Sequence, residues 1–68
     1  MEKITYIIFN IGQDMCRITC NDIRTQFSKY ADGACICDLT TLMYEMQSIT
    51  NACRMNHVQA VFEFCGDF

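Results

Sequence analysis

Cysteine and histidine are the residue types in this sequence that could ligate a metal or act as nucleophile and base. The chain has six cysteines and one histidine. A structural zinc site needs four such ligands around one ion. The cysteines come as near pairs, and the set that could hold a metal, if one is bound, is Cys35, Cys37, Cys53 and His57.

The spacing of these residues disfavours a metal centre. Cys35 and Cys37 share one face of an expected strand, about 6–7 Å apart at a rise of ~3.3 Å per residue, which is wide for two zinc ligands. The helix that carries Cys53 is expected to end at Asn56, before His57. We therefore expect no metal and no cofactor, and we expect the thiols to act as small apolar side chains. A metal-binding or redox-responsive thiol protein remains the alternative.

A thiol enzyme is also disfavoured. A nucleophilic cysteine needs a lowered pKa, which a nearby cation or a helix N-terminus can supply. Cys37 is the cysteine nearest to an expected helix start, but the neighbouring Asp38 carboxylate raises the pKa of a thiol. The sequence contains no Cys-x-x-Cys motif and no Gly-rich phosphate loop. The chain is therefore predicted to be non-enzymatic.

The composition predicts a folded, acidic single domain spanning residues 1–68. Hydrophobic residues make up 51% of the chain and charged residues 19%, unlike a disordered protein. The net charge of −3 and the pI of about 4.7 disfavour direct nucleic-acid binding. A chain this short buries only about 60% of its unfolded surface. We therefore expect a homodimer partner or a protein target to cover some of its apolar surface.

The expected location is the cytoplasm. The first apolar run follows a single lysine, Lys3, contains polar residues and precedes no small-residue cleavage site, so it does not resemble a secretory leader. No run approaches the ~20 apolar residues of a membrane helix. In a reducing compartment the cysteines are expected to be free thiols.

Residues 4–11 predict a central strand, because apolar side chains occupy both alternating faces. Gly12, Gln13 and Asp14 supply turn chemistry, so residues 3–20 predict a hairpin whose second strand covers 15–20. The later apolar spacing predicts a helix over 22–32, a short strand or a loop packed into the core over 34–37, a helix over 39–55 and a strand over 57–65.

These elements predict an α+β fold in the order β-β-α-β-α-β, with a mixed sheet of three to four strands and two helices on one face. Both helices are expected to be right-handed crossovers. The second, third and fourth strands would then be parallel, and the first strand would be antiparallel to them. The first strand would be central, and its far face would be open to a dimer partner or a target.

A contact surface for such a partner is predicted on the second helix. The stripe of this helix that faces the core is expected to be Leu39, Leu42, Met43, Met46, Ile49 and Cys53. Tyrosine and methionine are enriched at protein interfaces. The predicted partner-binding residues are on the opposite face, with one flanking acid: Tyr44, Ser48, Asn51 and Met55, flanked by Glu45.

We expect the protein to be a stoichiometric inhibitor or adaptor of a protein target, as are small phage and mobile-element proteins that block host machinery. One variant is mimicry of nucleic acid, which steep salt dependence of binding would support. The acids available for it are Asp32, Asp38, Glu45, Glu63 and Asp67. If the helix face is wrong, the next candidate is the uncovered sheet face with Arg17, Thr19, Gln59 and Glu63.

Overall fold

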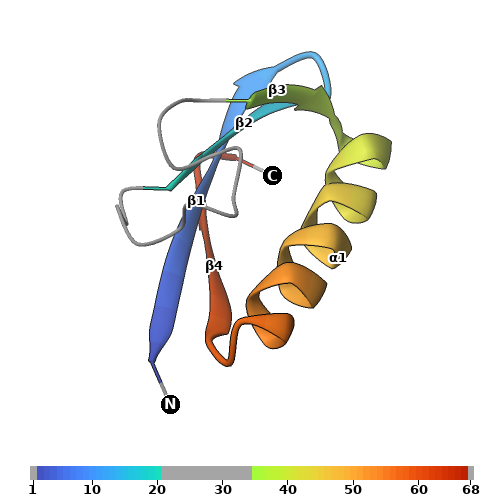
Figure 1. Ribbon diagram of the computed structural model, residues 1–68. Helices are drawn as coiled ribbons and strands as arrows, with labels where there is room; N and C mark the ends of the chain where they lie inside the picture. The colour runs from blue at the N-terminus through green and yellow to red at the C-terminus, as the bar shows by residue number, and fades with distance from the viewer. Residues whose placement is uncertain (1, 21–34, 68) are drawn as a thin grey trace.

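The computed structural model describes residues 2–20 and 35–67, which form a four-stranded sheet and one helix. The elements are β1 (Lys3–Gly12), β2 (Met15–Cys20), β3 (Cys35–Asp38), α1 (Leu39–Met55) and β4 (Gln59–Cys65). The strand order is β3-β2-β1-β4, and α1 runs across one face of the sheet from the β3 edge to the β4 edge (Figure 1). No helix in this part of the chain has the length and apolarity needed to cross a membrane.

Strand β1 is central, as its two-sided apolar pattern predicted. It pairs antiparallel with β2 and parallel with β4, so that Tyr6 lies between Cys20 and Phe62. The predicted turn is also confirmed: Gln13 and Asp14 both have positive φ, the conformation of the two-residue turns that join antiparallel strands. The hairpin and the first and last residues of its second strand are therefore as the sequence predicted.

The predicted order β-β-α-β-α-β is wrong, although the α+β class holds. The described elements run β-β-β-α-β and contain one helix rather than two. The other predicted helix, 22–32, lies outside the described residues. The described helix, α1, has the longer apolar repeat and a capping residue at each end.

The predicted strand directions are wrong as well. Strand β3 is antiparallel to β2, and it is β1, β3 and β4 that are parallel to one another. The prediction treated the segment between β2 and β3 as a crossover. Those two strands are direct neighbours with Ile18 opposite Cys35, and antiparallel neighbours do not require a crossover. The β3-α1-β4 connection is the crossover in the described chain.

The core lies between α1 and the side of the sheet that faces it. Four of its ten buried residues are cysteines, so thiols fill a large share of this small interior. The Tyr6 hydroxyl, which is fully buried, lies 3.7 Å from the Cys53 sulfur at hydrogen-bonding distance. The buried residues are Ile4, Tyr6, Ile8, Cys16, Ile18, Cys20, Cys37, Leu42, Ile49 and Cys53.

Candidate functional site

Helix α1 begins where the sequence predicted, at the Asp38 cap. The Asp38 carboxylate accepts a hydrogen bond of 2.9 Å from the Thr41 backbone N–H, which satisfies one of the free donors of the first turn. Hydrogen bonds from the Thr41 side chain and backbone hold the pKa of the Asp38 carboxyl below its ordinary value. The cap joins α1 directly to β3, because Asp38 is the last residue of that strand.

The helix ends in a left-handed capping motif built on His57. The His57 N–H donates to the Arg54 carbonyl, and the Val58 N–H donates to the Cys53 carbonyl, as in a Schellman motif. His57 has φ of 60°, a conformation that glycine usually supplies at this position. The exposed histidine is therefore positioned by the turn that connects α1 to β4, and its backbone has a structural role.

The inner face of α1 is narrower than predicted. Leu42, Ile49 and Cys53 are buried against the sheet. Met43 was assigned to the core stripe, but 73% of its surface is exposed, and Leu39 is also exposed. The buried residues follow one line along the helix, whereas Met43 comes directly after Leu42 and lies about 100° around the helix from it, at the flank of that line.

The outer face of α1 carries three large exposed side chains with apolar surface. Met43, Tyr44 and Met55 are exposed by 73%, 71% and 81%. The charged residue among the exposed residues of this face is Arg54, and the others are neutral. We define the outer face by its exposed residues Thr40, Met43, Tyr44, Gln47, Ser48, Asn51, Arg54 and Met55.

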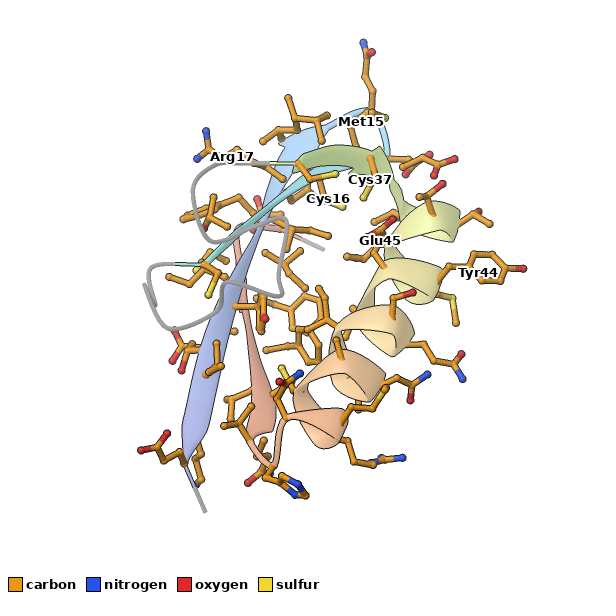
Figure 2. All side chains as sticks on the ribbon, in the orientation of Figure 1. Met15, Cys16, Arg17, Cys37, Tyr44 and Glu45 are labelled. Carbon is orange, nitrogen blue, oxygen red and sulfur yellow. The ribbon has the colours of Figure 1, made fainter. Side chains whose placement is uncertain are left out.

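The predicted partner-binding residues divide between this outer face and the side of the helix. Tyr44, Ser48, Asn51 and Met55 are on the outer face, and Figure 2 shows the Tyr44 ring pointing away from the sheet. Glu45 is half-buried and lies on the side of α1 nearer the sheet (Figure 2).

Sequence reasoning missed Met43, which it had placed in the core. Met43 and Tyr44 border a shallow hollow of about 260 Å³ together with Thr40 and Gln47. Helical spacing gives a signal that could have separated Met43 from Met46, because relative to Leu42 the Met46 side chain is about 40° around the helix and that of Met43 about 100°. The hollow extends the predicted surface by one turn toward the start of the helix.

The side of the sheet away from α1 is a second apolar surface. None of the elements in the described ranges lies over it. Ile7, Phe9 and Val61 are half-buried there, and Ile36 is exposed. The Arg17 guanidinium lies 5.0 Å from the centre of the Phe9 ring, a cation–π contact between directly paired residues. Of the residues predicted for this face, Arg17, Gln59 and Glu63 are exposed and Thr19 is half-buried.

The four residues that could hold a metal, if one is bound, are not brought together by the fold. Cys35 and Cys37 are in β3 at the start of α1, whereas Cys53 and His57 are at its other end. At 1.5 Å per residue the two pairs are roughly 20 Å apart along the helix. No cluster of three or more metal-ligating side chains occurs within residues 2–20 and 35–67.

The fold instead brings Cys37 to Cys16, a pairing that the sequence analysis did not consider. The two residues are directly opposite each other on β3 and β2, and their sulfur atoms are 3.6 Å apart (Figure 2). The Cys16 thiol also donates to the Cys37 carbonyl oxygen at 3.4 Å. Burial, the neighbouring Cys16 thiol and, to a smaller extent, Cys35 and Asp38 together raise the pKa of the Cys37 thiol to about 12.

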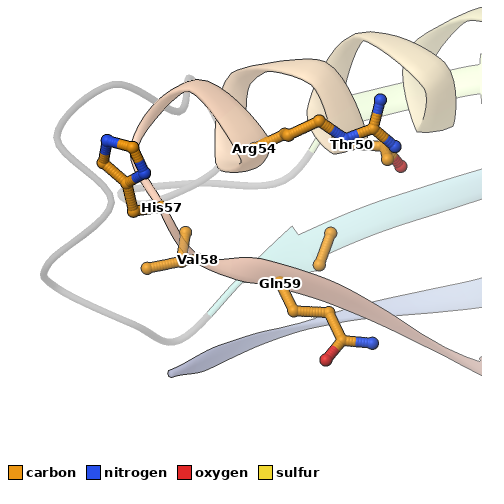
Figure 3. Close-up of a pocket in the computed structure, with 6 residues that line it drawn as sticks. Thr50, Arg54, His57, Val58 and Gln59 are labelled. Atoms are coloured by element: carbon orange, nitrogen blue, oxygen red, sulfur yellow. The ribbon is translucent and has the colours of Figure 1, made fainter. Parts of the chain in front are cut away.

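A pocket of about 420 Å³ lies between the end of α1 and the start of β4 (Figure 3). Arg54, His57 and Gln59 line it, and all three side chains are exposed to solvent. An anion here would meet the Arg54 guanidinium and the nitrogen atoms of His57 and Gln59, but also the negative end of the helix dipole. We therefore regard the pocket as a weaker candidate for ligand binding than the outer face of α1 is for protein binding.

No protein-family model, no curated protein and no solved structure matches this chain. Function is therefore inferred from the side chains described above.

Proposed function

We propose that the protein is a small non-enzymatic interaction module that binds a protein target through the outer face of α1. The observation that carries this proposal is the exposure of Met43, Tyr44 and Met55 on one face of a helix with a single charged residue among them. Large apolar side chains and few charges are typical of the centre of a protein interface.

Two physical arguments support this choice of surface. A solvated helix face normally carries lysine and glutamate, whereas this face has neutral side chains around Tyr44. Tyrosine also gives a large contact area for the loss of only two side-chain torsions. The hollow beside Tyr44 would accept an apolar side chain of the target.

The target is proposed to be a protein that the module inhibits or links to another component in the cytoplasm. None of the six cysteines forms a disulfide, which suits a reducing compartment. A second copy of the chain is also proposed as a partner. The net charge of −3 would oppose self-association only weakly if the neutral outer face or the uncovered sheet face formed the contact.

The proposal is tested by site-specific crosslinking in the cells from which the protein comes. A photoreactive phenylalanine replaces Tyr44 on the outer face, or Gln59 on the uncovered side of the sheet, and the crosslinked proteins are identified by mass spectrometry. We expect a specific adduct from position 44. An adduct from position 59 alone would place the interface on the sheet, and no adduct from either position would contradict the interaction module.

Affinity measurements with the identified partner then check the energetic role of the face. Tyr44→Ala is expected to weaken binding at least 10-fold, as for a central interface residue, whereas Gln59→Ala leaves it unchanged. A steep fall in affinity with salt would favour nucleic-acid mimicry by the acidic residues over binding through the outer face. Sedimentation equilibrium on the same variants reports the oligomeric state.

A further inference from the structure

The Cys16 and Cys37 thiols lie within reach of each other in the core. Both residues are almost fully buried, with 0% and 7% of their surface exposed. Opposite residues of an antiparallel pair have Cα atoms ~4.5–5.5 Å apart, and a disulfide needs ~4.4–6.8 Å. The backbone geometry of β2 and β3 therefore already suits a bond between the two sulfur atoms, which are 3.6 Å apart.

Oxidants in solution should gain access to β3, the strand that carries Cys37, more easily than to the central strands. β3 has four residues, lies at the edge of the sheet and pairs with β2. A short edge strand opens at a lower free energy than the strands inside a sheet. Opening of β3 would expose both thiols without separating β1 from either of its neighbours.

We propose that Cys16 and Cys37 form a dithiol site that small-molecule disulfides oxidise to an intramolecular disulfide, which fastens β3 to β2. In a reducing compartment the pair stays as two thiols, and it closes when the thiol–disulfide balance becomes oxidising. This site is independent of the outer face of α1 and of any partner bound there.

The reaction is an ordinary thiol–disulfide exchange with oxidised glutathione as the oxidant. One cysteine loses its proton, and its sulfur attacks a glutathione sulfur, so a mixed disulfide forms and one glutathione thiolate leaves. The second cysteine loses its proton and attacks the protein sulfur of that mixed disulfide. The Cys16–Cys37 bond forms and the second glutathione thiolate leaves. Two protein thiols are oxidised, and one glutathione disulfide is reduced to two thiols that take up the two protons.

Formation of the Cys16–Cys37 disulfide would restrain helix α1 as well as strand β3. Asp38 follows Cys37 and caps α1, so a bond at Cys37 restrains the first turn of the helix. The bond would also close a loop of about 20 residues, which reduces the freedom of the unfolded chain. Folding and disulfide formation should therefore favour each other.

The test is a glutathione redox titration of the full chain. Burial and a high thiol pKa slow the exchange, so each redox buffer is left to equilibrium before N-ethylmaleimide blocks the remaining thiols. Trypsin separates Cys16, in residues 4–17, from Cys37, in residues 30–54. We expect the first oxidised species to be two hydrogens lighter, with these two peptides linked. Its formation constant should be roughly 30- to 700-fold larger in the folded protein than in guanidinium.

Variants assign the bond within the second peptide, which also contains Cys35 and Cys53. Cys37→Ala should abolish the link, whereas Cys35→Ser should retain it. Fragment ions of the wild-type linked peptides give the same assignment if Cys37→Ala does not fold. A first link that involves any other cysteine, glutathione adducts without an internal link, or equal formation constants in the folded and unfolded chains would each overturn the proposal.

Discussion

The inner and outer faces of α1 both carry apolar side chains, but they differ in what those side chains contact. On the inner face Leu42, Ile49 and Cys53 are buried against the sheet. On the outer face Met43 and Tyr44 extend into solvent. Apolar character in a helix therefore does not by itself identify the core, since the orientation of the helix on the sheet decides which stripe is buried. The inner face should control stability, and the outer face should control binding.

The largest effect is expected from the inner face. Ile49→Ala removes three buried carbon atoms at the centre of the helix–sheet contact and should cost about 2–5 kcal/mol. A domain of this size has a total stability of only ~3–5 kcal/mol, so the variant should be largely unfolded at 37 °C. Urea unfolding followed by circular dichroism measures the change. A loss below about 1 kcal/mol would show that α1 is not held by this face.

An intermediate effect on stability is expected from the N-terminal cap of α1, because the cap stabilises the helix that carries both faces. Asp38→Ala removes the cap and should lower Tm by a few degrees, whereas Asp38→Asn keeps a capping oxygen and should change it less.

The Asp38 charge also predicts a pH dependence. The pKa of Asp38 is lowered in the folded chain. The stability that the Asp38 carboxylate adds is therefore present above the unfolded pKa of ~3.9, and it is lost as the pH falls through the folded pKa. Wild-type Tm should therefore fall further than that of Asp38→Asn between pH 5 and pH 2. Parallel curves for the two proteins would contradict a role for the carboxylate.

The smallest effect on stability is expected from the outer face. Met43→Gln and Tyr44→Gln replace exposed side chains with a good helix former, so the free energy of unfolding should stay within about 0.5 kcal/mol of wild type. The urea midpoint and slope provide the measurement. A loss comparable to that of Ile49→Ala would mean that these residues belong to a folded interface in the isolated protein, such as a homodimer.

Local features of the fold were predictable because they depend on nearby residues. The bounds of α1 follow from the Asp38 cap, the apolar repeat and Asn56, and the structure confirms them. The turn at Gln13 and Asp14 and the strand β2 were predicted for the same reason. Most of the predicted contact residues were likewise found exposed, because a helical repeat places them opposite the core.

Non-local features were not predictable in the same way. The pairing of β3 with β2, and with it the Cys16–Cys37 contact, depends on which strand edges meet. The exposure of Met43, at 73%, depends on how much of the flank of α1 the sheet covers.

The amino-acid sequence by itself determined the α+β class, the central strand, the capped helix and a cysteine-rich interior, because alternation, helical spacing and capping residues act over a few positions. Tertiary structure alone decided the strand directions, how wide a stripe of α1 is buried and which thiols meet. Those outcomes depend on contacts between residues far apart in the chain, such as Cys16 with Cys37, and no short-range pattern specifies them.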